Sequence, residues 1–420
     1  MRMRGVQAGL LLVLAACGTS ARTSNGSNAE GVDRSGLSAD PPFTASPVAR
    51  FDNPWAMDFL PGSTTAIVTE KPGRIWLVDV KSGAKQPVAG APRVVVSEQG
   101  GLLDVKLSPA FASDNLVYLT YAEPSANGGS GLALSRAKLV RDAKGARLEG
   151  SQLLWHDPAG GEGGQFGAII AFAPDRKSLF LSSGERQRFT PAQDPSQPLG
   201  KILHLTLDGK PAPGNPWAEK LGAAAVTITD PPRDTEAAKS TAGRKFTWPG
   251  PNLTPAETWS TGHRNPYGLA FDARGRLWET EMGPRGGDEL NLILPGKNYG
   301  WPLVSEGKNY DGVPIPPHSS RPDIVPPKLS WVPSISPSSL LIYSGNLFPQ
   351  WKGNGFVGAL SGQALIRVTF SGDNAQNADR WDMGHRIRWV GQGPDGAIYL
   401  LEDGAAARLL RLTPARSQDA

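Results

Sequence analysis

The chain contains a single cysteine, Cys17, among 420 residues. One thiol cannot form an intramolecular disulfide bond, and it cannot build a structural zinc site from thiolates. Long stretches with the 3.6-residue period of an amphipathic helix are scarce, while 50 glycines and 38 prolines interrupt the chain. These absences exclude a disulfide-stabilised scaffold and argue against a mainly helical protein.

An excess of charge of one sign is also missing. The sequence has 43 basic and 39 acidic residues, and without Arg2 and Arg4 the counts are 41 and 39, a net charge of +2. This balance gives no argument for nucleic acid or for a strongly acidic partner. After the N-terminal segment, no run of residues approaches the roughly 18 apolar residues of a transmembrane helix.

The N-terminus has the pattern of an export signal. Two arginines precede an apolar run from Ala8 to Ala16, and small residues lead directly into Cys17. We predict that residues 1–16 are a lipoprotein signal peptide and that Cys17 is acylated; an ordinary secretory signal with a chance cysteine is the alternative. Because Gly18 rather than an acidic residue follows, we expect the periplasmic face of the bacterial outer membrane, with the acyl anchor as the only membrane contact.

Residues 17–45 are rich in Ser, Gly, Asn and Ala and contain almost no large apolar side chains. Such a segment cannot bury enough apolar surface to order itself, so it is predicted to be a flexible tether. Residues 46–415 are long enough for a large hydrophobic core, and we expect them to form one domain.

Within that domain, a short apolar strand, a turn and a second apolar strand recur. Strands with a two-residue period, separated by turns of the Pro-Asp-Gly type, are typical of β-hairpins. About 370 residues allow roughly 60 per repeat, enough for four short strands and a loop. We predict an all-β fold, a six-bladed β-propeller, since a pair of β-sandwiches would not explain the repetition. The repeats begin at Trp55, Leu102, Ala168, Tyr267, Ser339 and Arg388.

The most informative stretch runs from Glu257 to Pro302. Residues 262–266 (GHRNP) provide fixed hydrogen-bond donors, and the loop from Glu281 to Glu289 offers free backbone carbonyls and paired carboxylates. Hard oxygen ligands of this kind are the ones that Ca²⁺ prefers. The pattern predicts an anionic cofactor bridged by a metal ion; a structural turn with a surface ion pair is the alternative.

Five motifs occur in order along the chain: residues 98–105 (EQGGLLDV), 262–266 (GHRNP), 283–289 (GPRGGDE), 298–302 (NYGWP) and 384–388 (GHRIR). Together they resemble the soluble, periplasmic aldose sugar dehydrogenases of the glucose/sorbosone dehydrogenase family, which depend on pyrroloquinoline quinone (PQQ). The likeness extends from about Asn53 to Thr413. It implies oxidation of aldose sugars to lactones with PQQ and Ca²⁺, and transfer of the electrons to an acceptor.

The motif match also implies which residues hold the cofactor. Gln99, Arg264 and Asn265 are expected to contact PQQ. Arg386 and Arg388 are two residues apart, so on a strand their side chains point to the same face. There they are expected to hold the acids of the cofactor and to stabilise developing negative charge, because a guanidinium pairs bidentately with a carboxylate and keeps its charge.

Two Ca²⁺ positions follow from the same resemblance. The backbone carbonyls of Gly283 and Pro284 are expected to bind the Ca²⁺ that bridges to the cofactor. Asp288, Glu289 and the backbone of Tyr299 are expected to form a second, structural Ca²⁺ site.

The sequence departs from the family pattern at two functional positions. Gln165 replaces the histidine that serves as catalytic base, and a carboxamide has no useful pKa near neutrality. Ser361 replaces the lysine that is expected to reach the cofactor. Glu185 matches the acid that normally orients the histidine, and burial could raise its pKa enough for direct base catalysis. We therefore predict Gln165, Glu185 and Arg264 as the catalytic positions.

These departures leave other functions open. A catalytically inactive or re-purposed propeller lipoprotein could bind a sugar, a glycan or a protein on the same face, because glutamine forms good hydrogen bonds with sugars. A metal-dependent hydrolase of lactones is a third possibility, although no cluster of acids and asparagines stands out in the sequence.

Overall fold

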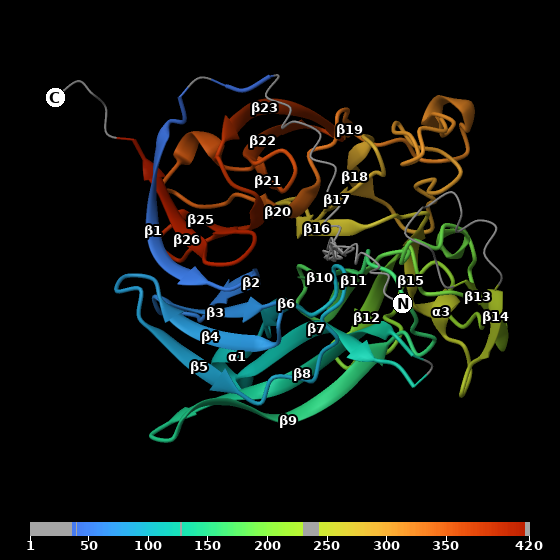
Figure 1. The fold of residues 1–420 in the computed structure, drawn as a ribbon, viewed down its shortest axis with the longest axis horizontal. Helices are drawn as coiled ribbons and strands as arrows, with labels where there is room; N and C mark the ends of the chain where they lie inside the picture. Colours follow the sequence, from blue (N-terminus) through green and yellow to red (C-terminus); the bar gives the residue numbers. More distant parts are fainter. Residues whose placement is uncertain (1–35, 39, 127, 230–242, 416–420) are drawn as a thin grey trace, which may run out of the picture. The chain divides into compact units, whose positions relative to one another are not determined.

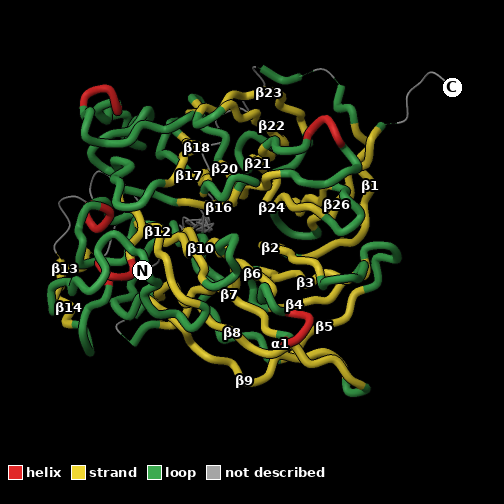
Figure 2. Tube along the Cα trace, turned by 180° about the vertical axis from the view of Figure 1, so that it is seen from behind, coloured by secondary structure: helices red, strands yellow, loops and turns green. Residues whose placement is uncertain are grey.

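All six predicted strand–turn–strand segments form antiparallel strand pairs in the described part of the chain. The computed structural model describes residues 36–38, 40–126, 128–229 and 243–415. The predicted signal peptide, Cys17, Gly18 and most of the predicted tether lie outside these residues. The prediction of an all-β protein is confirmed, since the helices in these residues have only three or four residues each (Figure 2).

The first two units along the chain join in one eight-stranded sheet of order β2-β3-β4-β5-β9-β8-β7-β6. All neighbours are antiparallel except β5 and β9, which pair in parallel at Val88 and Ala146. A short helix, α1 (Phe111–Asp114), precedes β7. The strands are β2 (Pro54–Phe59), β3 (Thr65–Glu70), β4 (Arg74–Asp79), β5 (Lys85–Ala89), β6 (Leu102–Leu107), β7 (Leu116–Pro124), β8 (Ser130–Asp142) and β9 (Gly145–His156).

The next two sheets have four strands each, in the orders β10-β11-β12-β15 and β16-β17-β18-β19. Between β12 and β15 the chain forms a separate hairpin of β13 (Ala225–Thr229) and β14 (Gly243–Thr247), followed by α3 (Thr254–Glu257). Single 3₁₀ turns lie at Thr190–Ala192 and His318–Ser320. The strands are β10 (Gly167–Phe172), β11 (Ser178–Ser183), β12 (Lys201–Thr206), β15 (Thr258–Thr261), β16 (Pro266–Phe271), β17 (Leu277–Glu281), β18 (Asp288–Ile293) and β19 (Leu329–Trp331).

Two further four-stranded sheets have the orders β20-β21-β22-β23 and β1-β26-β25-β24. A 3₁₀ turn at Pro349–Trp351 precedes β21. The strands are β20 (Pro337–Ile342), β21 (Gly355–Ala359), β22 (Ala364–Ser371), β23 (Asn374–Asp382), β24 (Ile387–Gln392), β25 (Ile398–Glu402), β26 (Ala407–Pro414) and β1 (Phe43–Phe51).

The strand β1 begins earlier than the sequence predicts. The tether was predicted to end at residue 45, but Phe43 already pairs with Pro414 in β26. The first described strand thus completes the sheet that the last three strands begin. Most of β1 is exposed and has no strong hydrophobic pattern, so its pairing is decided by the partner strand.

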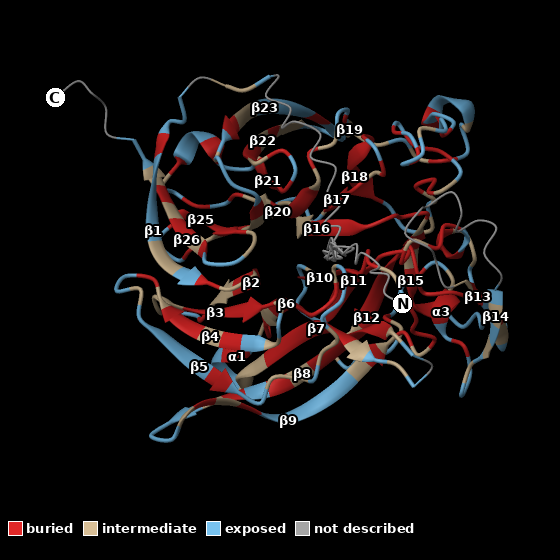
Figure 3. Cartoon of the chain, in the orientation of Figure 1, coloured by how far each residue is buried: buried red, intermediate tan, exposed pale blue. Residues whose placement is uncertain are grey.

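The first strands of successive units contact one another in a closed series: β2, β6, β10, β16, β20, β24 and again β2. In Figure 2 the labels of all six strands surround a common centre, and Figure 1 shows the same arrangement for β2, β6, β10, β16 and β20. The second strands are almost wholly buried, as in β11, β21 and β25, whereas β1 and much of β9 are exposed (Figure 3). The buried side chains of the inner strands therefore form the hydrophobic core. Burial of one large aliphatic side chain there stabilises the fold by about 1.5–3 kcal/mol.

In each unit, the start of the first strand pairs with the end of the second. Gly167 pairs with Ser183, Pro266 with Glu281, and Ile387 with Glu402. Residues that precede a first strand or follow a second strand therefore share one edge of each sheet. We call this edge the site edge.

Candidate functional site

Gln99, which precedes β6, connects three units at the site edge. Its side-chain oxygen Oε1 accepts hydrogen bonds from the backbone N of Gln165 (3.0 Å), Nδ2 of Asn265 (3.2 Å) and the Tyr267 hydroxyl (2.7 Å). Its amide nitrogen has no hydrogen bond to another described residue, and the side chain is half-buried. The predicted positions 99 and 265 are thus brought together, and Gln99 retains donors for a ligand.

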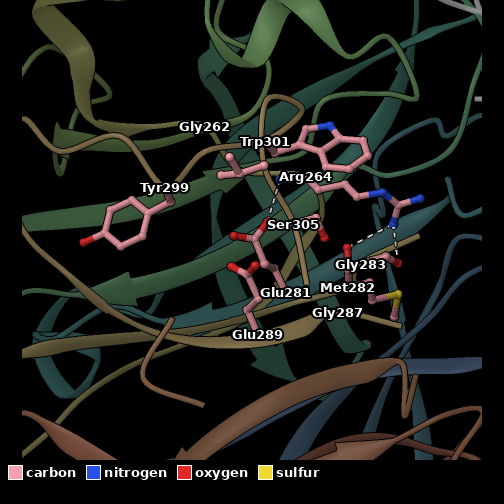
Figure 4. A pocket seen from close by; sticks show the side chains of 11 residues that line it. Gly262, Arg264, Glu281, Met282, Gly283, Gly287, Glu289, Tyr299, Trp301 and Ser305 are labelled. Carbon is pink, nitrogen blue, oxygen red and sulfur yellow. Dashed lines mark hydrogen bonds between the residues drawn. The ribbon is translucent and has the colours of Figure 1, made fainter. Parts of the chain in front are cut away.

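Arg264, which precedes β16, lies in a small pocket and is only 3% exposed (Figure 4). Its Nη1 donates to the carbonyls of Met282 (2.9 Å) and Gly283 (2.8 Å). Nη2 donates to the Tyr310 hydroxyl at 3.3 Å, and the ring of Trp301 lies 5.2 Å from the guanidinium carbon. The buried Nε has no hydrogen-bond partner among the described residues. The arginine therefore retains an unused donor.

The loop that follows β17 is folded back tightly. A Cβ atom on Gly283 would lie 2.3 Å from the carbonyl oxygen of Gly286 and 2.5 Å from that of Gly287. Only glycine fits such an approach. The Gly283 carbonyl lines the same pocket as Arg264, while the following residue, Pro284, is buried.

Gln165 lies between Glu185 and Arg264. With its side-chain amide nitrogen directed towards Glu185, Gln165 donates to Oε1 of Glu185, and its oxygen accepts a 2.8 Å hydrogen bond from Nη2 of Arg264. The Gln165 backbone is left-handed, with φ of 58°. The carbonyl oxygen of Gln165 would lie 2.0 Å from a Cβ atom on Gly184, so the approach of the two segments requires that glycine. The three predicted catalytic positions are adjacent.

Glu185 itself does not reach the surface of the site. Its side chain is fully buried, and its carboxylate accepts hydrogen bonds from the backbone N–H groups of Gln187, Arg188 and Phe189. Burial raises the pKa of the carboxyl, against the lowering effect of Arg264 and these amides. A base must come within hydrogen-bond reach of the proton that it removes. The prediction that Glu185 acts directly on the substrate does not agree with this geometry.

Arg386 and Arg388 share a carboxylate, as their spacing suggests. Arg386 Nε donates to Oδ2 of Asp403 (2.8 Å), and Arg388 Nη2 donates to Oδ1 (2.8 Å). The Arg388 guanidinium carbon lies 4.3 Å from the ring centre of Trp55, which packs edge-on against Tyr267. These contacts connect the arginine pair with the residues around Gln99. Neither Trp55 nor Asp403 was predicted as a site residue.

The predicted set for the structural Ca²⁺ site is only partly brought together. Glu289 and Tyr299 line the Arg264 pocket, where Figure 4 shows the carboxylates of Glu289 and Glu281 close to each other. Asp288 instead accepts hydrogen bonds from Ser334 Oγ and from the backbone N–H groups of Gly283, Ile335 and Ser336. Adjacent residues on a strand point to opposite faces, so Asp288 does not join Glu289.

A buried acidic cluster, missed by the sequence prediction, surrounds Glu289. Asn291 Nδ2 donates to Glu279 (3.1 Å), Glu289 (3.1 Å) and Glu281 (3.4 Å). Burial and the neighbouring carboxylate of Glu281 raise the pKa values of Glu279 and Glu289 well above their usual range. The clue in the sequence was the two-residue spacing of polar side chains on neighbouring strands, Glu279 with Glu281 and Glu289 with Asn291. Glu279, Glu281 and His263 each offer a ligand atom, all within 4.8 Å of one another, and could hold a cation.

His263 and His318 have structural partners. His263 lies between Ser260 Oγ (2.8 Å) and Glu281 Oε1 (3.1 Å) and stacks on Tyr299. His318 Nε2 is 3.1 Å from the Tyr299 carbonyl oxygen. Ser361 is exposed, with its hydroxyl 2.8 Å from that of Ser336, so position 361 supplies no cation.

Fold and site together define an all-β protein with buried arginine and amide donors beside a carboxylate cluster. A family model described as "Glucose / Sorbosone dehydrogenase" matches residues 51–243 and 247–411. The chain therefore belongs to the glucose/sorbosone dehydrogenase family, and the resemblance inferred from the motifs is confirmed.

Relatives of known structure or name agree with this assignment. "Aldose sugar dehydrogenase YliI" of Escherichia coli (strain K12) is 34% identical over 374 residues, which cover 87% of this chain and 91% of the relative. A crystal structure of a glucose dehydrogenase is 38% identical, with a TM-score of 0.76, covering 88% of this chain and 99% of that one. The PQQ-bound aldose sugar dehydrogenase of Streptomyces coelicolor is 27% identical, with a TM-score of 0.65, covering 90% and 99%.

Proposed function

We propose that this chain is a PQQ- and Ca²⁺-dependent dehydrogenase that oxidises aldose sugars to lactones in the periplasm. The observation that carries the proposal is the convergence of unused donors at the site edge. The amide nitrogen of Gln99 and the buried Nε of Arg264 lack partners among the described residues, and two further arginines share only one carboxylate. Such a donor set fits a planar polycarboxylate.

The fold is proposed to be a six-bladed β-propeller. The eight-stranded sheet counts as two blades, β2–β5 and β6–β9, because the strand pairing that joins them is the short parallel one of β5 with β9. With the other four-stranded sheets this gives six blades in the described residues, whose first strands contact one another in a closed series. Pairing of β1 with β26 closes the ring.

PQQ would be held by Gln99, Arg264, Asn265, Arg386 and Arg388. When bound, the quinone supplies the acceptor for the hydride that leaves the sugar. The protein supplies positive charge and fixed donors: Asn265 is fixed by its bond to Gln99, and the Gly167 backbone N donates to its Oδ1. Arg388 is fixed by Trp55 and Asp403. Because these donors are held in place before a ligand binds, little is lost in ordering them.

Ca²⁺ is proposed at two positions. The Gly283 and Pro284 carbonyls would bind the ion at the cofactor, and Glu289 with the Tyr299 carbonyl would bind a structural ion, joined by Glu281 rather than Asp288. Buried carboxylates are costly unless a cation compensates them. The unpartnered Oε1 of Glu279, buried within the described residues, fits such a need.

Proton removal from the sugar hydroxyl is the weak step of this site. Gln165 cannot act as a base, and Glu185 lies beneath it with its oxygens engaged. We therefore infer that any turnover is slow and that Glu185 positions Gln165.

A second function is favoured by the hydrogen bonds of Gln165. Gln165 is bonded to both Glu185 and Arg264, an arrangement that stabilises an amide rather than a proton acceptor. A re-purposed relative that binds a sugar, glycan or protein on the site edge would have this site.

In either case, the acyl anchor at Cys17 and the location at the outer membrane are proposed from the sequence of residues 1–18. No helix among the described residues is long and apolar enough to cross a membrane.

The test is a titration of the full mature chain, with Cys17→Ser to prevent acylation, with PQQ in the presence and absence of Ca²⁺. Quenching of tryptophan fluorescence reports binding, because Trp55 and Trp301 contact the predicted cofactor arginines. Tight, Ca²⁺-dependent binding followed by dye-coupled sugar oxidation would support the dehydrogenase. No binding at saturating Ca²⁺ would overturn it in favour of the glycan- or protein-binding function.

A further inference from the structure

A lysine that the motifs do not single out, Lys71, is fixed at the site edge directly after β3. Its backbone N donates to the carbonyl of Asn53 (2.8 Å), and its own carbonyl accepts from the backbone N of Leu102 (2.9 Å). A Cβ atom on Gly101 would lie 2.6 Å from Cγ of Lys71 and 2.3 Å from its carbonyl oxygen. The side chain of Lys71 thus passes directly over Gly101 of the neighbouring unit. The backbone of Lys71 is held by hydrogen bonds to its own unit and to the neighbouring one.

The Lys71 ammonium group lies among the charged residues of the site. Its Nζ donates to the Glu98 carbonyl, next to Gln99. Burial and the positive charge of Arg388 hold the pKa of Lys71 below its usual value, while Asp403 and Glu98 act in the opposite direction. An ammonium has three donors, and the hydrogen bonds within the described residues use one.

Among the residues that the structure describes, the charges around this lysine do not cancel. Lys71, Arg386 and Arg388 are three cations, and the carboxylates that face them are those of Asp403 and Glu98. Asp403 is already shared by both arginines. Like charges in a partly buried place repel, so an arrangement with an excess of positive charge favours a bound anion.

Lys71 and Ser361 have neighbouring, not identical, positions in their units. Glu70 and Ala359 are the equivalent ends of the second strands; Lys71 comes one residue after the first, and Ser361 comes two residues after the second. Lys71 follows β3, the second strand of β2–β5, and Ser361 comes shortly after β21, the second strand of β20–β23. The unit that contains Arg388 lies between them in the series of first-strand contacts. Arg388 can therefore be flanked by a cation from one side or from the other.

We propose that Lys71 is an anion-binding residue of the cofactor site, which places beside Arg388 the cation that Ser361 does not provide. This inference rests on the proposed function, because the anion in question is a carboxylate or quinone oxygen of the cofactor. The contact with the Glu98 carbonyl would remain as the support that directs the ammonium. A purely structural role would be to connect Glu98 to β3.

The test compares Lys71→Met and Lys71→Arg with Lys352→Met, a change at an exposed lysine whose Nζ contacts only Asn346 in the described residues. All are made in the full mature chain with Cys17→Ser. Affinity for PQQ is measured by fluorescence quenching with Ca²⁺ at two NaCl concentrations. We expect Lys71→Met to weaken binding about tenfold or more and to reduce its salt dependence, as loss of a charge-assisted hydrogen bond does. Lys71→Arg should retain most of the affinity, and Lys352→Met all of it.

A second measurement does not depend on a variant that folds. In the protein with all lysines unchanged, acetylation of Lys71 is followed by mass spectrometry. It is measured without a ligand, with PQQ, and with benzene-1,3,5-tricarboxylate as a simple polycarboxylate. Protection of Lys71 but not of Lys352 supports the inference. Binding of PQQ with no protection, or unchanged affinity in Lys71→Met, overturns it while the proposed function stands. Protection by the tricarboxylate without binding of PQQ would leave Lys71 as a site for anions but would overturn its role towards the cofactor together with the dehydrogenase; absence of both rejects both.

Discussion

Replacing Gln165 by histidine is the sharpest test of the site, because it changes one side chain and adds one chemical capacity. The backbone at this position has φ of 58°, a left-handed conformation in which histidine is found more often than most residues. The side chain would meet the partners that the Gln165 amide now has, the Glu185 carboxylate and the Arg264 guanidinium. The imidazole would thus have an acid to orient it.

The expected gain can be estimated from the role of a positioned base. General-base catalysis contributes roughly 10²–10⁴-fold in rate, which corresponds to about 3–5 kcal/mol of barrier. A neutral imidazole is required, so the added activity should rise with pH through the histidine pKa and be lost below it. Because Arg264 lies 2.8 Å from the present amide oxygen, we expect the gain to lie at the lower end of this range.

The assay is dye-coupled oxidation of aldoses by the PQQ- and Ca²⁺-loaded protein, with PQQ affinity measured in parallel. Gln165→Asn is the matched control, since it retains an amide and adds no base. The double change Gln165→His with Glu185→Gln should lose part of the gain, because the histidine then lacks its acid. If Gln165→His binds PQQ normally but is no faster than Gln165→Asn, position 165 is not the place of proton removal and the reasoning is refuted.

Three other predictions follow from buried groups. Glu185→Gln should lower the free energy of unfolding by about 1–3 kcal/mol in denaturant titrations, since it leaves backbone N–H groups poorly paired; an unchanged free energy of unfolding would contradict this. Burial raises the pKa of Glu257 to about 7, so its contribution to stability is complete below the ordinary pKa of 4.5 and is lost as the pH rises through 7. Glu257→Gln, which can still accept from Trp155 Nε1, should flatten this part of the profile by at most about 3 kcal/mol, and parallel urea-unfolding profiles between pH 5 and 8 would contradict this. Ca²⁺ at a hundredfold excess over its Kd should stabilise the fold by about 2.7 kcal/mol, measured by thermal unfolding with and without chelator; Glu289→Gln should remove the effect, and an equal response in that variant would place the ion elsewhere.

The strand pairs could be predicted from sequence because their signals are local. The strand pattern of the segments that begin at Leu102 and Ala168 can be read from neighbouring residues alone. Both segments form strands where the sequence predicts them. The outer strands gave no such signal. In β9, which begins at Gly145, most side chains are exposed or half-buried, and its parallel pairing with β5 depends on a residue almost 60 positions away.

The candidate site was predicted unevenly for the same reason. The motifs identified Gln99 and Arg264, and the structure brings both to the site edge. The spacing of Asp288 and Glu289 suggested one metal site, but adjacent residues on β18 face opposite sides. Glu281 was missed, because its hydrogen-bond partners His263, Arg264 and Asn291 lie 10 to 18 positions away in the chain.

The sequence by itself determined the hairpins, the charge balance, the family, and the presence of Gln165 and Ser361 where the motif match leads us to expect a histidine and a lysine. Each of these is written in the identity or the local spacing of residues. Only the tertiary structure decided that Gln165 lies on Glu185, that β1 pairs with β26, and that Lys71 packs against Gly101 and donates to the Glu98 carbonyl. These contacts join residues up to more than 300 positions apart, and they exist because the first strands close into a ring, which no local pattern specifies.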